Sequence, residues 1–302
     1  MSWPAYLELH QRGELEQRAK AAERLLEACR VCPRECLSHR LQGETGVCGV
    51  GDQAMVASYG PHFGEERPLV GSGGSGTIFL AHCNLCCVFC QNFEISQQDE
   101  GRIVSARELA GMMLELQRMG CHNINFVTPT HQVPQILRAL PIALNGGLRV
   151  PLVYNCGGYE SLETLRLLNG VVDIYMPDFK YADAAVAKRY SKVENYPEVA
   201  RVALREMHRQ VGDLSLDSRG IARRGLLVRH LVLPNDLAGT GEVVRFLADL
   251  SKDTYVNIMD QYRPCYRAHE YPSLTRRPTR EEFEEALRLA REAGLHRLDG
   301  YC

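Results

Sequence analysis

The sequence predicts an α/β fold, built either as a barrel or as an open sheet of parallel strands. Most of the six candidate strands are short runs that are rich in Val, Ile, Leu, Phe and Tyr and lack polar alternation, which is typical of strands covered on both faces. Helical segments separate them, and a strand–helix alternation repeated about six times is what both arrangements require. The expected strands span residues 77–81, 124–127, 152–154, 173–176, 226–233 and 255–259.

Helix starts support this reading. Ser105 with Glu108, and Thr279 with Glu282, have the spacing of capping boxes. Residues 5–28 read as two helices divided at Gly13. Further helices are expected at residues 183–190 and 197–211, and after the plausible N-caps Ser161 and Thr240.

Composition narrows the class of protein. The 302 residues carry a net charge of −2, which favours neither nucleic-acid nor anionic-membrane binding. No apolar run approaches the roughly 20 residues of a membrane span, and no signal peptide is recognisable after Met1. Twelve cysteines in such a chain indicate a reducing cytoplasm and metal chemistry. We expect two domains, residues 1–70 and 71–302, with the glycine-rich run 71–76 as a flexible join.

One stretch holds four cysteines in eight residues, Cys83, Cys86, Cys87 and Cys90. Such density without a secretory signal indicates metal binding rather than disulfides. Two registers fit: C-x3-C-x2-C uses Cys87, and C-x2-C-x3-C uses Cys86. Either supplies three thiolates, whereas an ordinary iron–sulfur cubane takes four, so one iron would stay open to another ligand. The alternative is a zinc knuckle or a group of buried structural thiols.

C-x3-C-x2-C with Phe89 before its last cysteine is the signature of radical S-adenosylmethionine (SAM) enzymes. The run from Gly76 to Leu85, continued by residues 88–92, resembles the branch of homologues of pyruvate formate-lyase-activating enzyme. The resemblance implies a partial (β/α)6 barrel, similar to a TIM barrel, with a small cysteine-rich N-terminal domain. It also implies a [4Fe–4S] cluster on Cys83, Cys87 and Cys90, with SAM chelating the fourth iron.

A second cysteine set precedes the first: Cys29, Cys32, Cys36 and Cys48, spaced C-x2-C-x3-C-x11-C. Glycines and a proline mark tight loops around them, which suits a chain wrapped about an ion or cluster. Four thiols leave no open position, so a closed structural site is expected, holding either zinc or an auxiliary iron–sulfur cluster. The alternative is four unliganded thiols. This stretch, too, is similar to the same branch.

Polar residues follow the expected strands, where parallel barrels gather their chemistry. In place of the family's Gly-Gly-Glu stand Thr128, Thr130 and His131, which puts an acidic SAM ligand in doubt. Asp178 and Lys180 resemble the Asp-Leu-Lys of formate-lyase activases, where the Asp helps to hold a monovalent cation beside the SAM carboxylate. By position, Asn155, Cys156 and the Met176 carbonyl would complete that cation site. The residues expected to bind SAM are Phe89, Asn92, Thr128, Thr130, His131, Asn155, Asp178 and Lys180.

The resemblance implies an enzyme that cleaves SAM to a 5′-deoxyadenosyl radical, which takes hydrogen from a substrate. That substrate could be a glycyl-radical protein, another peptide or a small molecule. The electron would come from a low-potential donor such as flavodoxin or ferredoxin. A non-catalytic metal-binding scaffold protein is the alternative of another class, and no catalytic side chain is assigned. A zinc hydrolase is disfavoured because no H-E-x-x-H or His/Asp cluster is present.

Overall fold

The six expected strands are all present and form one parallel array. They are β2 (Ser75–Leu80), β4 (Ile124–Val127), β5 (Leu152–Cys156), β6 (Ile174–Pro177), β8 (Ala222–Leu231) and β9 (Tyr255–Met259). The array runs in that order, and each neighbouring pair is parallel. The structure is a computed structural model, and it describes residues 3–299.

Three strands that periodicity does not predict extend this array into a nine-stranded sheet. They are β1 (Ala54–His62), β3 (Arg102–Val104) and β7 (Ser215–Leu216). Strand β1 pairs antiparallel with β2, β3 with β1, and β7 with β8. Within residues 3–299, β9 pairs with neither β1 nor β2, so the barrel stays open. The predicted fold class, a partial (β/α)6 barrel, is confirmed.

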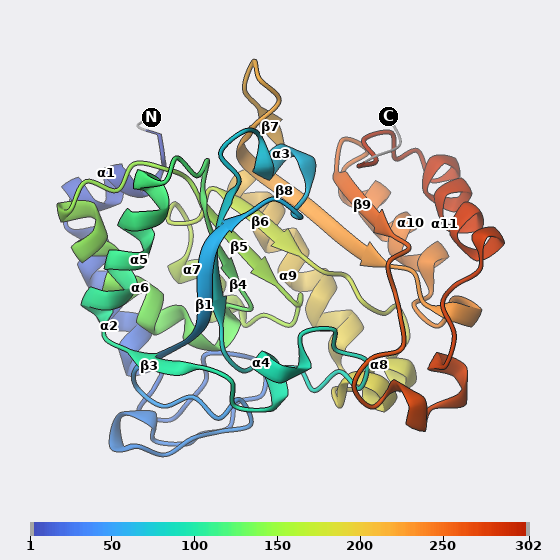
Figure 1. Cartoon of the computed structure of the whole chain (residues 1–302), viewed down its shortest axis with the longest axis horizontal. Coiled ribbons are helices and arrows are strands. Elements are labelled where there is room, and N and C mark those ends of the chain that lie inside the picture. The colour runs from blue at the N-terminus through green and yellow to red at the C-terminus, as the bar shows by residue number, and fades with distance from the viewer. Residues whose placement is uncertain (1–2, 300–302) are drawn as a thin grey trace.

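Helices connect every pair of consecutive strands in the array and cover its outer face (Figure 1). Both expected capping boxes are formed, at Ser105 and Thr279. None of the helices in the described range combines the length and apolar character that a membrane span requires. The helices are α1 (Tyr6–Gln11), α2 (Glu14–Arg24), α3 (Arg67–Val70), α4 (Phe93–Gln97), α5 (Ala106–Arg118), α6 (Val133–Asn145), α7 (Leu162–Leu167), α8 (Ala184–Ser191), α9 (Tyr196–Val211), α10 (Thr240–Leu250) and α11 (Arg280–Glu292).

Strand register brings the predicted polar residues to one edge of the sheet. Val127 at the end of β4 pairs with Asn155 of β5. The next backbone links continue past the strand ends, with Asp178 N–H donating to the Cys156 carbonyl at 2.8 Å. Asp178 also forms a parallel bridge with Arg229 of β8. The carboxyl ends of β4, β5 and β6 therefore meet, as parallel pairing requires.

The N-terminal segment packs onto this sheet from outside. Helices α1 and α2 lie beside α6 on the left of Figure 1. The Tyr6 hydroxyl donates to the Val150 carbonyl at 2.5 Å, and Ala5 N–H donates to Asp173 at 2.9 Å. Hydrophobic residues of these helices share one core with the barrel. The division at residue 70 stays a prediction, and its outer ends, residues 1–2 and 300–302, lie outside the described range.

The glycine-rich run 71–76 is a closely packed corner rather than the flexible join expected. Gly73 N–H donates to His122 Nε2 at 3.0 Å. A Cβ on Gly73 would stand 2.0 Å from the Gly120 carbonyl oxygen, so no larger residue fits without moving the backbone. Just before this corner, α3 inserts Leu69 among Val153, Ile174 and other inward-facing residues of the sheet. Leu69 thereby closes the barrel interior below the site.

We predict that Leu69→Ala lowers the free energy of unfolding by about 2–5 kcal/mol, because the change leaves a cavity at a fully buried position. Urea denaturation followed by circular dichroism measures this. Val202→Ala, on the outer face of α9 where the side chain is 44% exposed, is the control and should change stability by no more than about 0.5 kcal/mol. Equal small losses for both variants would contradict the packing role of Leu69.

Candidate active site

The loop that contains Cys83, Cys86, Cys87 and Cys90 follows β2 at the carboxyl edge of the sheet. Backbone hydrogen bonds to a later segment of the barrel hold it in place. The backbone N–H groups of Cys86 and Val88 donate to the carbonyls of Ser191 and Tyr190, at 3.3 and 2.8 Å. Both acceptors lie at the end of α8. The loop is therefore held in place by residues about 100 positions later in the chain.

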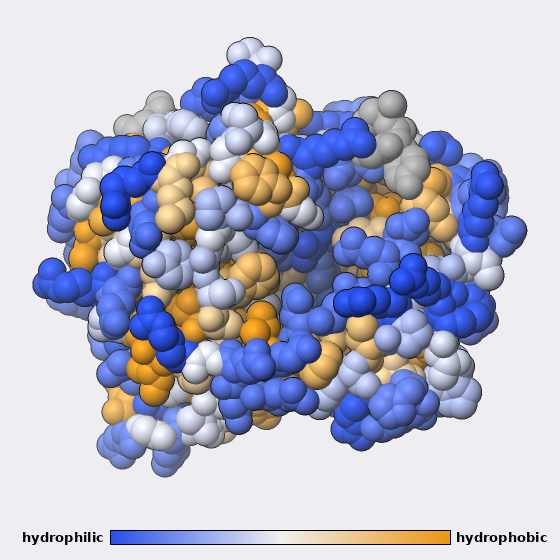
Figure 2. All heavy atoms as spheres, viewed as in Figure 1, coloured by the Kyte–Doolittle hydropathy of each residue, from blue (hydrophilic) through white to orange (hydrophobic). Residues whose placement is uncertain are grey.

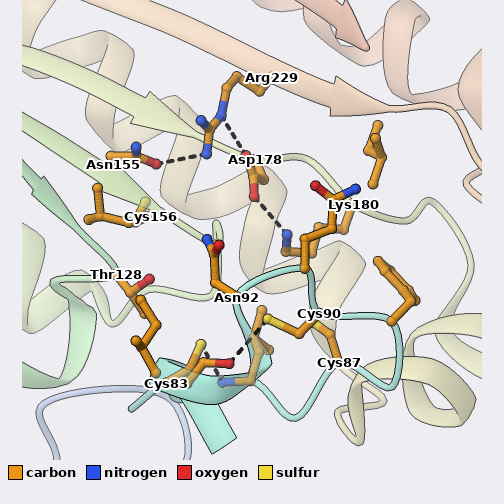
Figure 3. A pocket seen from close by; sticks show the side chains of 18 of the residues that line it. Cys83, Cys87, Cys90, Asn92, Thr128, Asn155, Cys156, Asp178, Lys180 and Arg229 are labelled. Atoms are coloured by element: carbon orange, nitrogen blue, oxygen red, sulfur yellow. Dashed lines mark hydrogen bonds and ion pairs between the residues drawn. The ribbon is translucent and has the colours of Figure 1, made fainter. Parts of the chain in front are cut away.

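A cavity of about 240 Å³ opens beside this loop. Cys83, Cys87 and Cys90 line it (Figure 3), and Cys86 is not among the lining residues. The Cys86 sulfur instead accepts a guanidinium N–H of Arg34 at 4.0 Å. The structure thus brings together the thiols of the C-x3-C-x2-C register. Figure 2 shows a hydrophilic hollow in the middle of this face, over the strands drawn in Figure 1.

Each of the three thiols has a polar neighbour. Cys87 Sγ lies 2.9 Å from Ser191 Oγ, and Cys90 Sγ lies 3.1 Å from Ser96 Oγ. Burial raises the pKa of Cys83, and negative charge on Cys87 would raise it further. Burial also raises the pKa of Cys87 to about 11, against the opposing effect of Lys180. The thiols of Cys83 and Cys87 therefore favour their protonated form at neutral pH, and a bound iron centre would supply the positive charge that thiolates need.

Charged residues form the other wall of the cavity (Figure 3). Lys180 Nζ donates to Asp178 Oδ2 at 2.6 Å, and Arg229 Nε donates to Asp178 Oδ1 at 2.8 Å. Arg229 Nη2 also donates to Asn155 Oδ1 at 2.7 Å. Burial alone would raise the pKa of Asp178, but Arg229 and Lys180 together hold it below its usual value. Asp178 is consequently an ionised anchor for two cations.

Two carboxyl groups lie beneath Arg229. Its Nη1 stands 3.9 Å from Glu65 and 3.8 Å from Glu66, which precede α3. Burial, opposed by Arg229 and reinforced by Glu66, raises the pKa of Glu65 to about 7. Asn257 of β9 donates to Glu66 at 3.1 Å. Arg229 therefore lies between the cavity wall and a carboxyl pair deeper in the barrel.

The residues expected to bind SAM fall into two groups. Phe89, Asn92, Thr128, Asn155, Asp178 and Lys180 line the cavity. Thr130 and His131 are fully buried and are not among the lining residues. His131 Nε2 lies 3.0 Å from the Ala81 carbonyl oxygen, and burial lowers its pKa to about 3. The 3₁₀ turn after Pro129 directs both side chains into the protein and away from the cavity.

Glu160 is a site residue that sequence reasoning missed. Its carboxyl group accepts from Thr130 Oγ1 at 2.7 Å and from Tyr154 OH at 2.8 Å. It is also hydrogen-bonded to Cys156, which lines the cavity. Burial raises the pKa of Glu160 to about 7. This carboxyl group thus joins the turn after β4 to the end of β5.

Sequence signals for the missed residues existed. Arg229 stands within the mostly apolar run 226–233, and a charged residue in a buried strand needs a partner inside the protein. Glu160 follows the polar stretch at the end of β5 by a few residues. Glu65 and Glu66 gave no such signal, because they approach the site from a loop outside the strand–helix pattern.

The second cysteine set lies in the loops between α2 and β1. Cys29, Cys32 and Cys48 are buried, and Cys36 is partly exposed. Across residues 3–299, no three His, Cys, Asp or Glu side chains already stand as a metal-ion site. Metal binding by either cysteine set therefore requires the thiols to turn toward a common centre.

Comparison with known proteins shows which family the chain resembles. A family model for the radical SAM superfamily matches residues 77–213. The uncharacterized protein MJ0674 of Methanocaldococcus jannaschii is 34% identical over 291 residues, covering 93% of this chain and 79% of that protein. MJ0808 of the same organism is 24% identical over 291 residues, with coverages of 88% and 78%. A solved structure described as "Structure of TYW1 with a lysine-pyruvate adduct bound" matches 72% of this chain and 73% of its own, with 9% identity and a TM-score of 0.44.

We predict that Glu160→Gln removes part of the pH dependence of stability. The raised pKa means that the folded chain holds this proton more tightly than the unfolded chain does. The resulting stabilisation is complete below pH 4.5 and is lost as the pH rises through about 7. Over that window the wild type should lose about 3 kcal/mol relative to the Gln variant. Urea denaturation at a series of pH values measures the difference.

Glu198→Gln, on the exposed surface of α9, is the matched control. A Glu160→Gln protein whose stability follows the wild-type pH profile would show that Glu160 is ionised in the folded chain.

Proposed function

Because the chain belongs to the radical SAM superfamily, we propose that it binds a [4Fe–4S] cluster and SAM in this cavity and cleaves SAM reductively. One observation carries the proposal. Three thiols in the C-x3-C-x2-C register line one wall of a cavity, and the other wall holds the partly buried cations Lys180 and Arg229. The first wall suits an iron–sulfur cluster with an open iron, and the second suits a carboxylate.

Cys83, Cys87 and Cys90 would hold such a cluster, which when bound would supply one electron for the cleavage of SAM to methionine and a 5′-deoxyadenosyl radical, and that radical would abstract hydrogen from a substrate. In this proposal Cys83, Cys87 and Cys90 hold three irons and leave the fourth open. The hydroxyls of Ser191 and Ser96 donate to two of the thiolates. Phe89 packs edge-on against Tyr181 and Tyr262, which fixes the loop between its last two ligands.

The charged wall would bind the carboxylate end of SAM. Lys180 and Arg229 both lie on Asp178, so two positive charges face the cavity with one ionised carboxylate between them. Lys180 and Arg229 would bind the SAM carboxylate through N–H donors that face the cavity, although Glu65 and Glu66 offset part of their charge. Thr128 and Asn92 bring a hydroxyl and an amide to the same cavity, and these groups can accept from the SAM ammonium. Asn155 would act through Arg229, which it orients.

Arg229 already occupies the oxygen atoms that the monovalent cation expected from the resemblance would bind. Both Asp178 oxygens accept from Lys180 or Arg229, and Asn155 Oδ1 accepts from Arg229. In the proposed site the guanidinium takes the place of the cation, and a sodium or potassium ion would have to displace it. The charge that such an ion would bring to the SAM carboxylate then comes from the chain itself.

An electron donor and a substrate complete the proposed reaction. The electron would come from a low-potential flavodoxin or ferredoxin. A glycyl-radical protein, another peptide or a small molecule would meet the radical at the mouth of the cavity. Anaerobic reconstitution with candidate partners, followed by product analysis by mass spectrometry, identifies the substrate.

We predict that Cys83→Ala, Cys87→Ala and Cys90→Ala each abolish SAM cleavage and lower the iron content of the reconstituted protein, because each removes a cluster ligand. Cys86→Ala should retain both, since its sulfur faces Arg34 rather than the cavity. Iron counts and 5′-deoxyadenosine release under strong reductant measure the two effects. Loss at Cys86 with retention at Cys87 would show that the other register is used.

We predict that Lys180→Ala weakens SAM binding about 10- to 100-fold, the cost of losing one hydrogen bond to a charged group, and leaves the iron content unchanged. Calorimetry beside iron counts measures this. Lys188→Ala is the control, because Lys188 is exposed and pairs with Glu194 on the surface of the protein. If both variants bind SAM as the wild type does, Lys180 serves only to neutralise Asp178.

A further inference from the structure

We propose that Cys29, Cys32, Cys36 and Cys48 form a second, closed metal centre, in which four thiolates bind zinc or an iron–sulfur cluster and hold the N-terminal loops against the active-site loop. This inference does not rest on SAM chemistry. It rests on where the four sulfurs lie, on what donates to them, and on the contacts that connect them to the first site.

The segment that carries the four cysteines has little regular structure of its own. Between α2 and β1 the described chain forms a single 3₁₀ turn, Arg40–Gln42. Backbone links fold it back on itself, with Cys29 N–H donating to the Ser38 carbonyl at 3.0 Å and Leu37 N–H to the Cys29 carbonyl at 3.1 Å. A segment with so few regular hydrogen bonds needs another source of order.

Contacts within these loops bring the four cysteines near one another. Leu37, next to Cys36, donates its N–H to the Cys29 carbonyl at 3.1 Å, and Val47, next to Cys48, donates its N–H to the Cys36 sulfur at 3.4 Å. Gly46 covers the Cys36 side chain so closely that a Cβ would stand 2.7 Å from its sulfur. Four thiolates this close repel one another, and a bound cation is what offsets such repulsion.

Each sulfur also has an N–H donor. Cys36 accepts from the backbone of Val47 at 3.4 Å, and Cys29 accepts from the Arg40 guanidinium at 3.7 Å. The backbone N–H groups of Arg34 and Val50 donate to the other two sulfurs, those of Cys32 and Cys48. Such donors stabilise negative sulfur and accompany metal-bound thiolates. With all four ligands supplied by the chain, the centre has no open position and is structural.

Two arginines connect this centre to the active-site loop. Arg34 donates to the Asn84 carbonyl at 2.9 Å and also to the Cys86 sulfur. Arg40 is fully buried and donates to the His131 carbonyl at 2.9 Å, in the turn after β4. Ordering the thiol-bearing loops would therefore position two segments of the active site.

The first test uses the wild-type chain. Purified anaerobically, it is alkylated with iodoacetamide before and after treatment with a strong chelator, and modified cysteines are mapped by mass spectrometry. Cys29, Cys32, Cys36 and Cys48 should be protected at first and should become reactive after chelation. Four thiols that are merely buried would react equally slowly in both samples, and that result would overturn the proposal.

The second test identifies the metal in a full-length Cys83→Ala/Cys87→Ala/Cys90→Ala variant, which lacks the first set. After chelation it is titrated with Zn²⁺ alone, or reconstituted with ferrous iron and sulfide. One zinc ion per chain, or the absorbance of one cluster, should appear and identify which centre is present. Adding Cys32→Ala and Cys48→Ala should abolish binding, whereas adding Cys121→Ala, a buried cysteine outside both sets, should retain it. Binding of neither metal by a chain with unchanged circular dichroism would refute the site, as would binding that survives the loss of Cys32 and Cys48.

Discussion

Arg229 places a permanent positive charge inside the curve of the sheet, and the site is arranged around that charge. Burying an unpaired ion costs several kcal/mol, and close partners must offset this cost. Asp178 and Asn155 accept from its guanidinium at 2.8 and 2.7 Å, and Glu65 and Glu66 lie within 3.9 Å. These partners come from β5, the end of β6 and the segment before α3. One side chain therefore joins parts of the chain that are far apart in sequence.

The same arrangement gives the cavity its charge before any ligand binds. Strand pairing positions Asn155 and Asp178, and Asp178 in turn holds the charged groups of Lys180 and Arg229 in place. The raised pKa of Glu65 favours its protonated form, which lessens the negative charge beneath Arg229. A wall built in this way can bind an anionic group without rearranging, which is what preorganisation requires. Backbone hydrogen bonds to the end of α8 hold the loop that carries the thiols on the opposite wall.

The structural features that depend on local sequence pattern were predicted correctly. All six parallel strands, both capping boxes and the cysteine spacing follow from runs and intervals that neighbouring residues define. Arg229, Glu65 and Glu160 were not predicted as site residues, because Arg229 pairs with Glu65 across 164 positions and Glu160 accepts from Thr130 across 30 positions. Thr130 and His131 were expected in the cavity because they follow a strand, yet the 3₁₀ turn directs them inward. Position after a strand locates a residue on the correct edge, but backbone conformation decides which way its side chain points.

The region that matches the radical SAM family model is smaller than the site that the chain builds. Residues 77–213 contain the three thiols, Asp178 and Lys180. They end before Arg229 and begin after β1, which covers the edge of β2 that the open barrel would otherwise expose. They also exclude Arg34, which binds the cysteine loop through the Asn84 carbonyl. The charge of the cavity thus depends on the chain after the matched region, and the support of its loop on the chain before it.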